Sequence, residues 1–201
     1  MKRLVLPALL AVLVGCSTQP IYPPAPAKAP GGFDWTYLLG PGDTVNVFVW
    51  GNPEVSGSFP IRPDGKLTMN LIEDLPASGK TPTQLAREIE KNLARYIQDP
   101  IVTVIVAGGT GPYSQQIRVL GEATKPQTLT YRENMSLIDV MISVGGITDF
   151  AAGNKASILR VVDGKPQQFA VRLEDLLKAG DISANVEMMP GDVLIIPESW
   201  F

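Results

Sequence analysis

Residues 38–51 read LLGPGDTVNVFVWG, and this stretch decides the fold. Its Pro-Gly pair suits the two central positions of a type II turn, because glycine readily adopts the positive φ required at the second of them. After the turn a valine occupies every second position, which is the pattern of a strand that buries one face. The stretch therefore predicts a tight turn that leads directly into a strand.

The same motif, a Pro-Gly turn followed by a strand, recurs near the end of the sequence, where residues 189–197 read MPGDVLIIP. In both places an aspartate follows the Pro-Gly pair, and such an aspartate binds nearby backbone N–H groups and fixes the start of the strand. Asp43 and Asp192 also present the alternative of a catalytic carboxylate pair, but we favour the turn interpretation. The residues predicted to have this structural role are Pro41, Gly42, Asp43, Pro190, Gly191 and Asp192.

Around the first strand, the pattern indicates a small α+β unit that ends near residue 107. Residues 59–69 are predicted to form a hairpin around Pro-Asp-Gly. Residues 81–97 are the clearest helix, since Thr81 and Gln84 form a capping box and a proline occupies the first helical position. The continuous apolar run 101–106 predicts a central strand. The apolar stripe of the predicted helix consists of Leu85, Ile89, Leu93, Tyr96 and Ile97.

A glycine-rich segment, residues 108–112, is predicted to link this unit to a second one. A phosphate-binding loop is the alternative, but no Gly-Lys-Ser/Thr sequence follows it. The second unit opens with a strand over 116–120 and a helix that begins after Ser136, whose capping partner is Asp139. Asp163-Gly164 predicts a two-residue hairpin further along the same unit.

The first sixteen residues have the layout of a secretory signal. A basic start precedes an apolar run over 4–14, which is about 16 Å long as a helix and too short for a hydrocarbon core of about 30 Å. Residues 13–16, LVGC, resemble the bacterial lipobox, which implies a signal peptide over 1–15 and a diacylglycerol on Cys16. The alternative is an ordinary signal with an incidental cysteine. By resemblance to lipoprotein sorting rules, Ser17 indicates the outer membrane as the destination.

Residues 16–32 follow the signal and are rich in proline and alanine, without apolar periodicity. We expect this segment to be a tether between the lipid and the folded body. In the polyproline II conformation it reaches about 50 Å, which allows the body to stand off the membrane.

The composition excludes several classes of function. The formal net charge is −3, with 17 basic and 20 acidic residues, so the chain lacks the basic surface that nucleic acids require. It contains no histidine, which removes the commonest metal ligand and the usual proton carrier at neutral pH. A single cysteine excludes an internal disulfide and any multi-cysteine metal site. We therefore expect no nucleic acid as a partner, and no metal or cofactor.

An ordered set of motifs carries a resemblance to a known family. The first unit resembles the polysaccharide biosynthesis/export domain in YLLGPGD (37–43), VWG (49–51), IRPDGK (61–66) and YIQDP (96–100). The second resembles the soluble-ligand-binding β-grasp domain in VLGE (119–122), SVGGI (143–147), LR (159–160) with DG (163–164), and PGD (190–192). The resemblance implies an α+β chain with an export domain over 33–107 and a β-grasp-like domain over 113–198. The ending, residues 196–201, is similar to the short export proteins of exosortase-associated exopolysaccharide loci.

This resemblance implies a non-enzymatic component of an exopolysaccharide export machine, anchored by lipid to the periplasmic face of the outer membrane. Its subunits are expected to form a homo-oligomeric ring that guides the polymer, with an inner-membrane polysaccharide copolymerase as partner. Long members of the family end in an amphipathic helix that builds an outer-membrane pore. Because no such membrane-spanning helix precedes Phe201, we expect a separate outer-membrane protein as a second partner.

Two other functions fit part of the sequence. One is a periplasmic glycan-binding lipoprotein that forms no ring. The other is a glycoside hydrolase or lyase that uses Glu73-Asp74 or Glu122, although hydrolysis needs two carboxylates facing each other and adjacent residues of an extended segment point apart.

Three aromatic residues are candidates for stacking on passing sugars, because an aromatic ring offers an apolar face beside a polar group. The alternative, which we favour, is that they pack in the core or at a subunit interface. These residues are Trp50, Tyr37 and Trp35.

Overall fold

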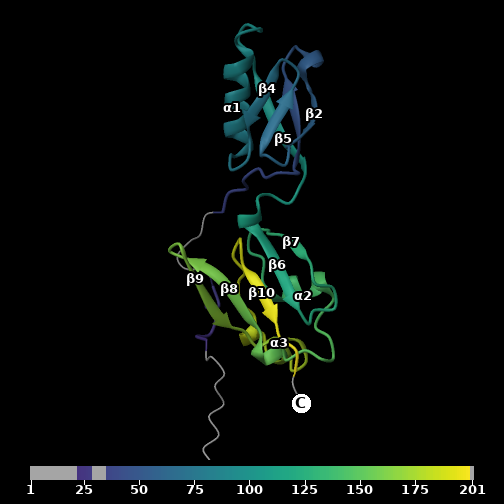
Figure 1. Cartoon of the computed structure of the whole chain (residues 1–201), viewed down its shortest axis with the longest axis vertical. Helices are drawn as coiled ribbons and strands as arrows, with labels where there is room; N and C mark the ends of the chain where they lie inside the picture. The colour runs from purple at the N-terminus through teal and green to yellow at the C-terminus, as the bar shows by residue number, and fades with distance from the viewer. Residues whose placement is uncertain (1–21, 29–34, 200–201) are drawn as a thin grey trace, which may run out of the picture.

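The computed structural model of the protein describes residues 22–28 and 35–199. They form two units that lie end to end, and the chain crosses from one to the other near residue 110 (Figure 1). Each unit combines strands with helices around its own hydrophobic cluster, which confirms the expected α+β class. No helix in the described part of the chain is long and apolar enough to cross a membrane.

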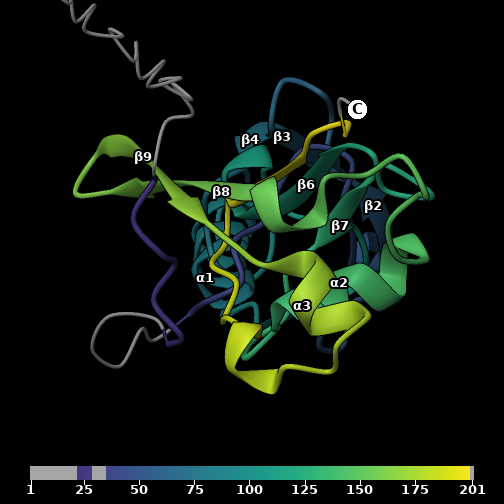
Figure 2. The same ribbon diagram turned by 90° about the horizontal axis from the view of Figure 1, so that it is seen from below.

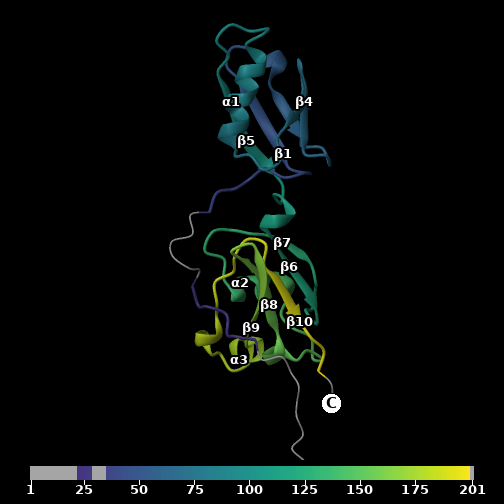
Figure 3. The same ribbon diagram turned by 60° about the vertical axis from the view of Figure 1, so that its left-hand side comes forward.

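The first unit contains a three-stranded antiparallel sheet, in the order β2-β1-β5, and a separate antiparallel hairpin. One helix packs against this sheet and hairpin on a single side (Figure 3). The elements are β1 (Thr44–Val49), the 3-10 helix η1 (Pro53–Val55), β2 (Gly57–Pro60), β3 (Lys66–Met69), β4 (Ile72–Pro76), α1 (Pro82–Leu93) and β5 (Val102–Gly108).

Local sequence explains why β1 and α1 form where they do. The three valines of β1 are buried and the residues between them are exposed, as the alternation predicts. Helix α1 starts at the predicted capping box: the Thr81 hydroxyl accepts the Gln84 N–H at 3.1 Å, and the Gln84 side chain accepts the Thr81 N–H at 2.9 Å. The valines of β1 and the leucines of α1 meet in one cluster, so strand and helix stabilise each other.

The helix of the first unit is shorter than the sequence predicts. It ends at Leu93 rather than Ile97, and Tyr96, placed on the buried stripe by the helical pattern, is 63% exposed. The chain leaves the helix in a turn that includes Asp99 with a φ of 47°. A left-handed residue cannot continue an α-helix. Of the two predicted stripe residues beyond Leu93, Ile97 still packs against the core of the first unit, whereas Tyr96 is exposed.

Two strand predictions for this unit were also wrong in detail. Strand β5 lies at an edge of the sheet and β1 at its centre. Only one face of β5 packs on the core, so Val104 is buried while Ile105 is exposed, despite the continuous apolar run. The predicted hairpin over 59–69 is divided between two sheets, whose strands are joined there by a single bridge between Ile61 and Leu67.

The second unit is a five-stranded mixed sheet in the order β7-β6-β10-β8-β9, in which β10 runs parallel to β6 and the other pairs are antiparallel. Helices α2 and α3 lie on one side of this sheet (Figure 2). The elements are the 3-10 helix η2 (Tyr113–Gln115), β6 (Gln116–Gly121), β7 (Thr128–Thr130), α2 (Leu137–Val144), η3 (Gly153–Lys155), β8 (Ser157–Val162), β9 (Lys165–Ala170), α3 (Leu173–Leu177), η4 (Ile182–Ala184) and β10 (Val193–Ile196).

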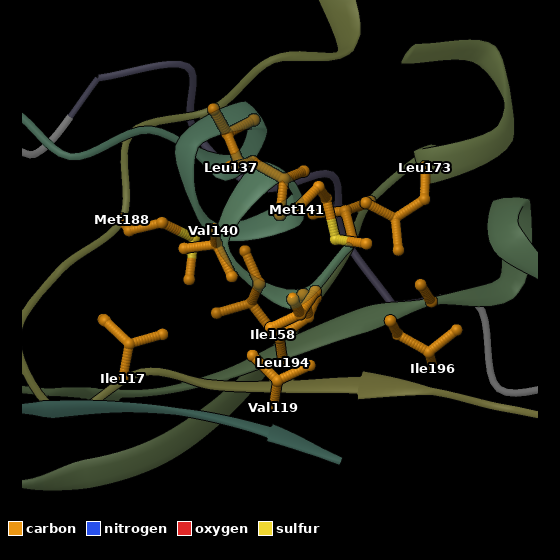
Figure 4. Close-up of a cluster of buried hydrophobic side chains, with 14 of the residues drawn as sticks. Ile117, Val119, Leu137, Val140, Met141, Ile158, Leu173, Met188, Leu194 and Ile196 are labelled. Carbon is orange, nitrogen blue, oxygen red and sulfur yellow. The ribbon is translucent and has the colours of Figure 1, made fainter. Parts of the chain in front are cut away.

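The core of this unit lies between the sheet and its helices. Side chains of β6, β8 and β10 meet those of α2 and α3 in a single cluster (Figure 4). Helix α2 has the predicted capping box of Ser136 and Asp139, and it ends at Gly145 with a φ of 77°. The Asp163-Gly164 pair, both with positive φ, joins β8 to β9 as predicted.

Residues 22–28 lie against the second unit although they precede the first in sequence (Figure 3). Pro24 forms a parallel bridge with Ala170 at the free edge of β9, where the Ala25 N–H donates to the Ala170 carbonyl at 3.0 Å. The Glu187 N–H donates to the Ala27 carbonyl, also at 3.0 Å. This part of the expected tether, residues 22–28, therefore covers a sheet edge instead of serving as a free spacer.

Candidate functional site

The aspartate of the first Pro-Gly-Asp turn lies at the joint between the two units. Asp43 is fully buried. One carboxylate oxygen accepts the Gly40 N–H at 2.8 Å and the Tyr37 hydroxyl at 2.7 Å. The other accepts the N–H groups of Thr110 and Gly111, both at 3.0 Å. One side chain thus fixes the turn and also holds the linker that leads to the second unit.

Further contacts at the joint tie the two units together. The Gln115 side chain accepts the Leu38 N–H at 3.3 Å and donates to the Thr36 carbonyl at 3.2 Å. The backbones of Gly40 and Gly111 approach so closely that a β-carbon on residue 40 would lie 2.3 Å from the Gly111 carbonyl carbon. The joint is therefore a close-packed contact of defined geometry.

The second Pro-Gly-Asp turn holds a buried ion pair. The Asp192 carboxylate accepts from Arg160 Nε at 2.9 Å and Nη2 at 2.7 Å, and from the Met189 N–H at 2.7 Å. The side chains of Arg160 and Asp192 are only 3% and 1% exposed. Both turn aspartates are thus enclosed by their own hydrogen-bond donors, an arrangement suited to fixing backbone rather than to acting on a substrate.

Two of the three aromatic stacking candidates lie in the joint. Trp35 packs against the core of the second unit and contacts Tyr131 edge to face, with ring centroids 5.2 Å apart. It also contacts Tyr37, at 6.1 Å, which packs against the core of the first unit. Burial and the hydrogen bond to Asp43 raise the pKa of Tyr37 well above its ordinary value. The structure therefore places Trp35 and Tyr37 in contacts between the units.

The third candidate, Trp50, has a different environment. It is 68% exposed, so packing in the core of its own subunit is excluded. Its ring contacts Phe48, which is 50% exposed, with centroids 6.2 Å apart. Sequence reasoning did not single out Phe48, although the alternation that buries the β1 valines places both aromatic residues on the opposite face.

The carboxylates considered for hydrolysis do not form an active site. Glu73 and Asp74 lie on the exposed side of the hairpin, where Asp74 pairs with Arg62 at 2.6 Å. Glu122 accepts the Thr148 hydroxyl at 2.6 Å in the other unit. Cys16, the predicted lipid-attachment residue, lies outside the described residues.

Comparison with known protein families finds one match in each unit. The polysaccharide biosynthesis/export protein family matches residues 33–107, and the SLBB domain matches residues 115–196. The chain belongs to the polysaccharide export protein family. That family consists of export proteins rather than enzymes, in agreement with the expectation from the sequence.

Similar proteins with curated names come from several bacteria. The chain is 25% identical to the EPS I polysaccharide export outer membrane protein of Ralstonia nicotianae, over 81% of this chain and 47% of that protein. It is 24% identical to the polysialic acid transport protein of Escherichia coli, over 86% of this chain and 30% of that protein. It is 30% identical to the exopolysaccharide production protein of Rhizobium meliloti, over 55% of this chain and 28% of that protein. The chain thus spans half or less of the length of these relatives.

Proposed function

We propose that this protein is a non-enzymatic subunit of an exopolysaccharide export machine, and that its copies form a ring through which the polymer passes. The observation that carries the proposal is the joint, where Asp43 fixes an export domain to an SLBB domain within one subunit. The names of the relatives, which refer to polysaccharide export and transport, support the same function.

A fixed joint is what a ring requires. Identical subunits close into a ring only when each presents its two contact surfaces at the same angle, since other angles produce open filaments. Free movement between the two units would lose that angle. The hydrogen bonds of Asp43 and Gln115 and the contact between Gly40 and Gly111 preserve it. The work of such a ring is steric: it surrounds the polymer and changes no covalent bond.

The segment over 22–28 supports an orientation relative to the outer membrane. Cys16 precedes Tyr22 by six residues, which reach no more than about 22 Å even when fully extended. A diacylglycerol on Cys16, contributing about 0.8 kcal/mol per buried CH₂, would therefore keep the second unit close to the periplasmic face of the membrane. The export domain lies at the other end of the molecule (Figure 1), where it would meet an inner-membrane polysaccharide copolymerase. We place a separate outer-membrane protein at the membrane end.

Deletion of the gene, with polymer measured inside and outside the cells, tests the export function. We expect polymer to disappear from the surface while its synthesis remains competent, and the plasmid-borne gene to restore secretion. Unchanged secretion by the deletion strain would contradict the proposal.

The anchor is tested by Cys16→Ala, with Ser17→Ala as the matched control. We expect Cys16→Ala to abolish acyl labelling and membrane fractionation, and Ser17→Ala to retain acyl labelling. Membrane fractionation of Cys16→Ala at the wild-type level would show that lipid on this cysteine is not the anchor.

A further inference from the structure

The sheet of the export domain has an outward face that is rich in exposed apolar side chains. The buried face of β2-β1-β5 packs on α1 and the hairpin, and the opposite face carries Phe48 and Trp50. Ile105 lies in β5 and is 56% exposed, and Ile101 is the residue just before β5 and is 61% exposed. Strand register places Phe48 opposite Thr103, so these residues form one continuous surface, which we call the outer sheet face.

The outer sheet face contains no charged side chain at the outward positions of its three strands. Among the apolar residues lie small neutral groups that can both donate and accept hydrogen bonds. Charged residues make up 18% of the chain, and the outer surface of α1 carries several, so this uncharged face differs from the surface around it. The outward strand positions are Thr44, Asn46 and Phe48 in β1, Ser58 and Pro60 in β2, and Thr103, Ile105 and Ala107 in β5.

We propose that the outer sheet face binds an uncharged stretch of the polysaccharide, an inference that rests on the proposed export function. One face of a pyranose ring presents C–H bonds, which are weakly positive and attracted to the negative face of an aromatic ring. Trp50 and Phe48 supply such rings. Asn46, Ser58 and Thr103 supply neutral partners for the sugar hydroxyls on either side.

The chemistry of this face suits transport better than tight capture. An uncharged surface forms no ion pair with a neutral sugar. Electrostatic attraction therefore does not hold the polymer on this face, and the affinity should depend little on salt. Stacking contacts of modest strength allow the polysaccharide to bind to this face and dissociate from it repeatedly. The interleaved hydroxyl and amide groups distinguish this face from the more apolar core of a subunit interface.

A titration of the full-length acylated protein in mild detergent tests the proposal. The probe is extracellular polysaccharide purified from the source strain, and binding is followed by affinity electrophoresis and tryptophan fluorescence. We expect Trp50→Ala and Phe48→Ala each to weaken binding about three- to tenfold, and Trp50→Phe to retain most of it. Tyr113→Ala, which removes a 75% exposed aromatic side chain from η2, is the control and should bind like the wild type. Affinity should change less than about twofold between 50 and 500 mM NaCl.

Four outcomes would overturn the inference. Two are results of the titration: no binding by the wild type, or binding as tight as that of the wild type by a Trp50→Ala/Phe48→Ala double variant that keeps its unfolding midpoint. Dissociation of the oligomer by the double variant would instead assign the outer sheet face to contact between subunits. Loss of surface polymer in the deletion strain, with full rescue by the double variant, would reject this glycan site while preserving the export function.

Discussion

Replacing Asp43 with alanine removes the group that joins the turn to the linker. The carboxylate accepts four hydrogen bonds, and its contacts with the Gly40 and Gly111 N–H groups are buried. Each buried group left without a partner costs about 1–3 kcal/mol, so we expect the free energy of unfolding of the export domain to fall by about 2–5 kcal/mol. At a denaturant dependence of about 2 kcal/mol per molar urea, the midpoint falls by about 1–2.5 M.

The assay is urea unfolding of the full-length chain, combined with limited proteolysis at the linker over 108–112. Asp43→Ala should be cleaved there faster than the wild type, because Thr110 and Gly111 lose their acceptor. Asp64→Ala is the matched control: this aspartate also lies in a turn, but its side chain is 43% exposed, so its loss should cost less than about 1 kcal/mol. An Asp43→Ala variant with wild-type stability and wild-type cleavage would refute the reasoning about the joint.

Three further predictions concern other positions in the two units. Asp192→Ala leaves the Arg160 guanidinium buried without its counter-ion, so unfolding measurements should show a loss of about 3–5 kcal/mol; a loss below 1 kcal/mol contradicts the ion-pair argument. Because the pKa of Tyr37 is raised in the folded state, the stability that this side chain contributes is complete below pH about 10 and declines above it. Tyr37→Phe should therefore reduce the difference between the unfolding midpoints at pH 8 and pH 11. An unchanged difference counts against this argument. Gly121 has a φ of 86°, and Gly121→Ala places a β-carbon 2.0 Å from a carbonyl oxygen of β10, so this variant should lower the thermal midpoint markedly. Gly180→Ala is the control, since Gly180 also has a positive φ but open space around it, and it should lower the midpoint less. Equal midpoints for the two variants oppose the steric explanation.

Features of the fold that depend on local chemistry were predictable from the sequence. The capping residues Thr81 and Ser136 act on backbone groups three positions away, so their motifs are readable in isolation. The Asp163-Gly164 pair specifies its own hairpin for the same reason. The alternation in β1 also predicts that Phe48 and Trp50 are exposed. The general tendency of aromatic residues to be buried instead favoured packing of Trp50 in the core or at a subunit interface, and Phe48 was not considered.

The joint was beyond the reach of sequence reasoning. Asp43 finds Thr110 and Gly111 across 67 and 68 residues, and no local motif indicates so distant a partner. The same holds for Pro24, whose proline-rich surroundings predict an extended backbone but not its pairing with Ala170 at the edge of β9. Long-range partners are chosen by the packing of whole units, which single-sequence patterns do not encode.

The mass of the full-length acylated protein in mild detergent tests the central claim most directly. Static light scattering after size exclusion, repeated over a hundredfold range of concentration, gives that mass without reference to the sugar. We predict a discrete multimer of fixed subunit number, lost or altered in Asp43→Ala. A protein that stays monomeric at every concentration, alone or with its membrane partners, contradicts the ring and favours a glycan-binding lipoprotein that acts singly.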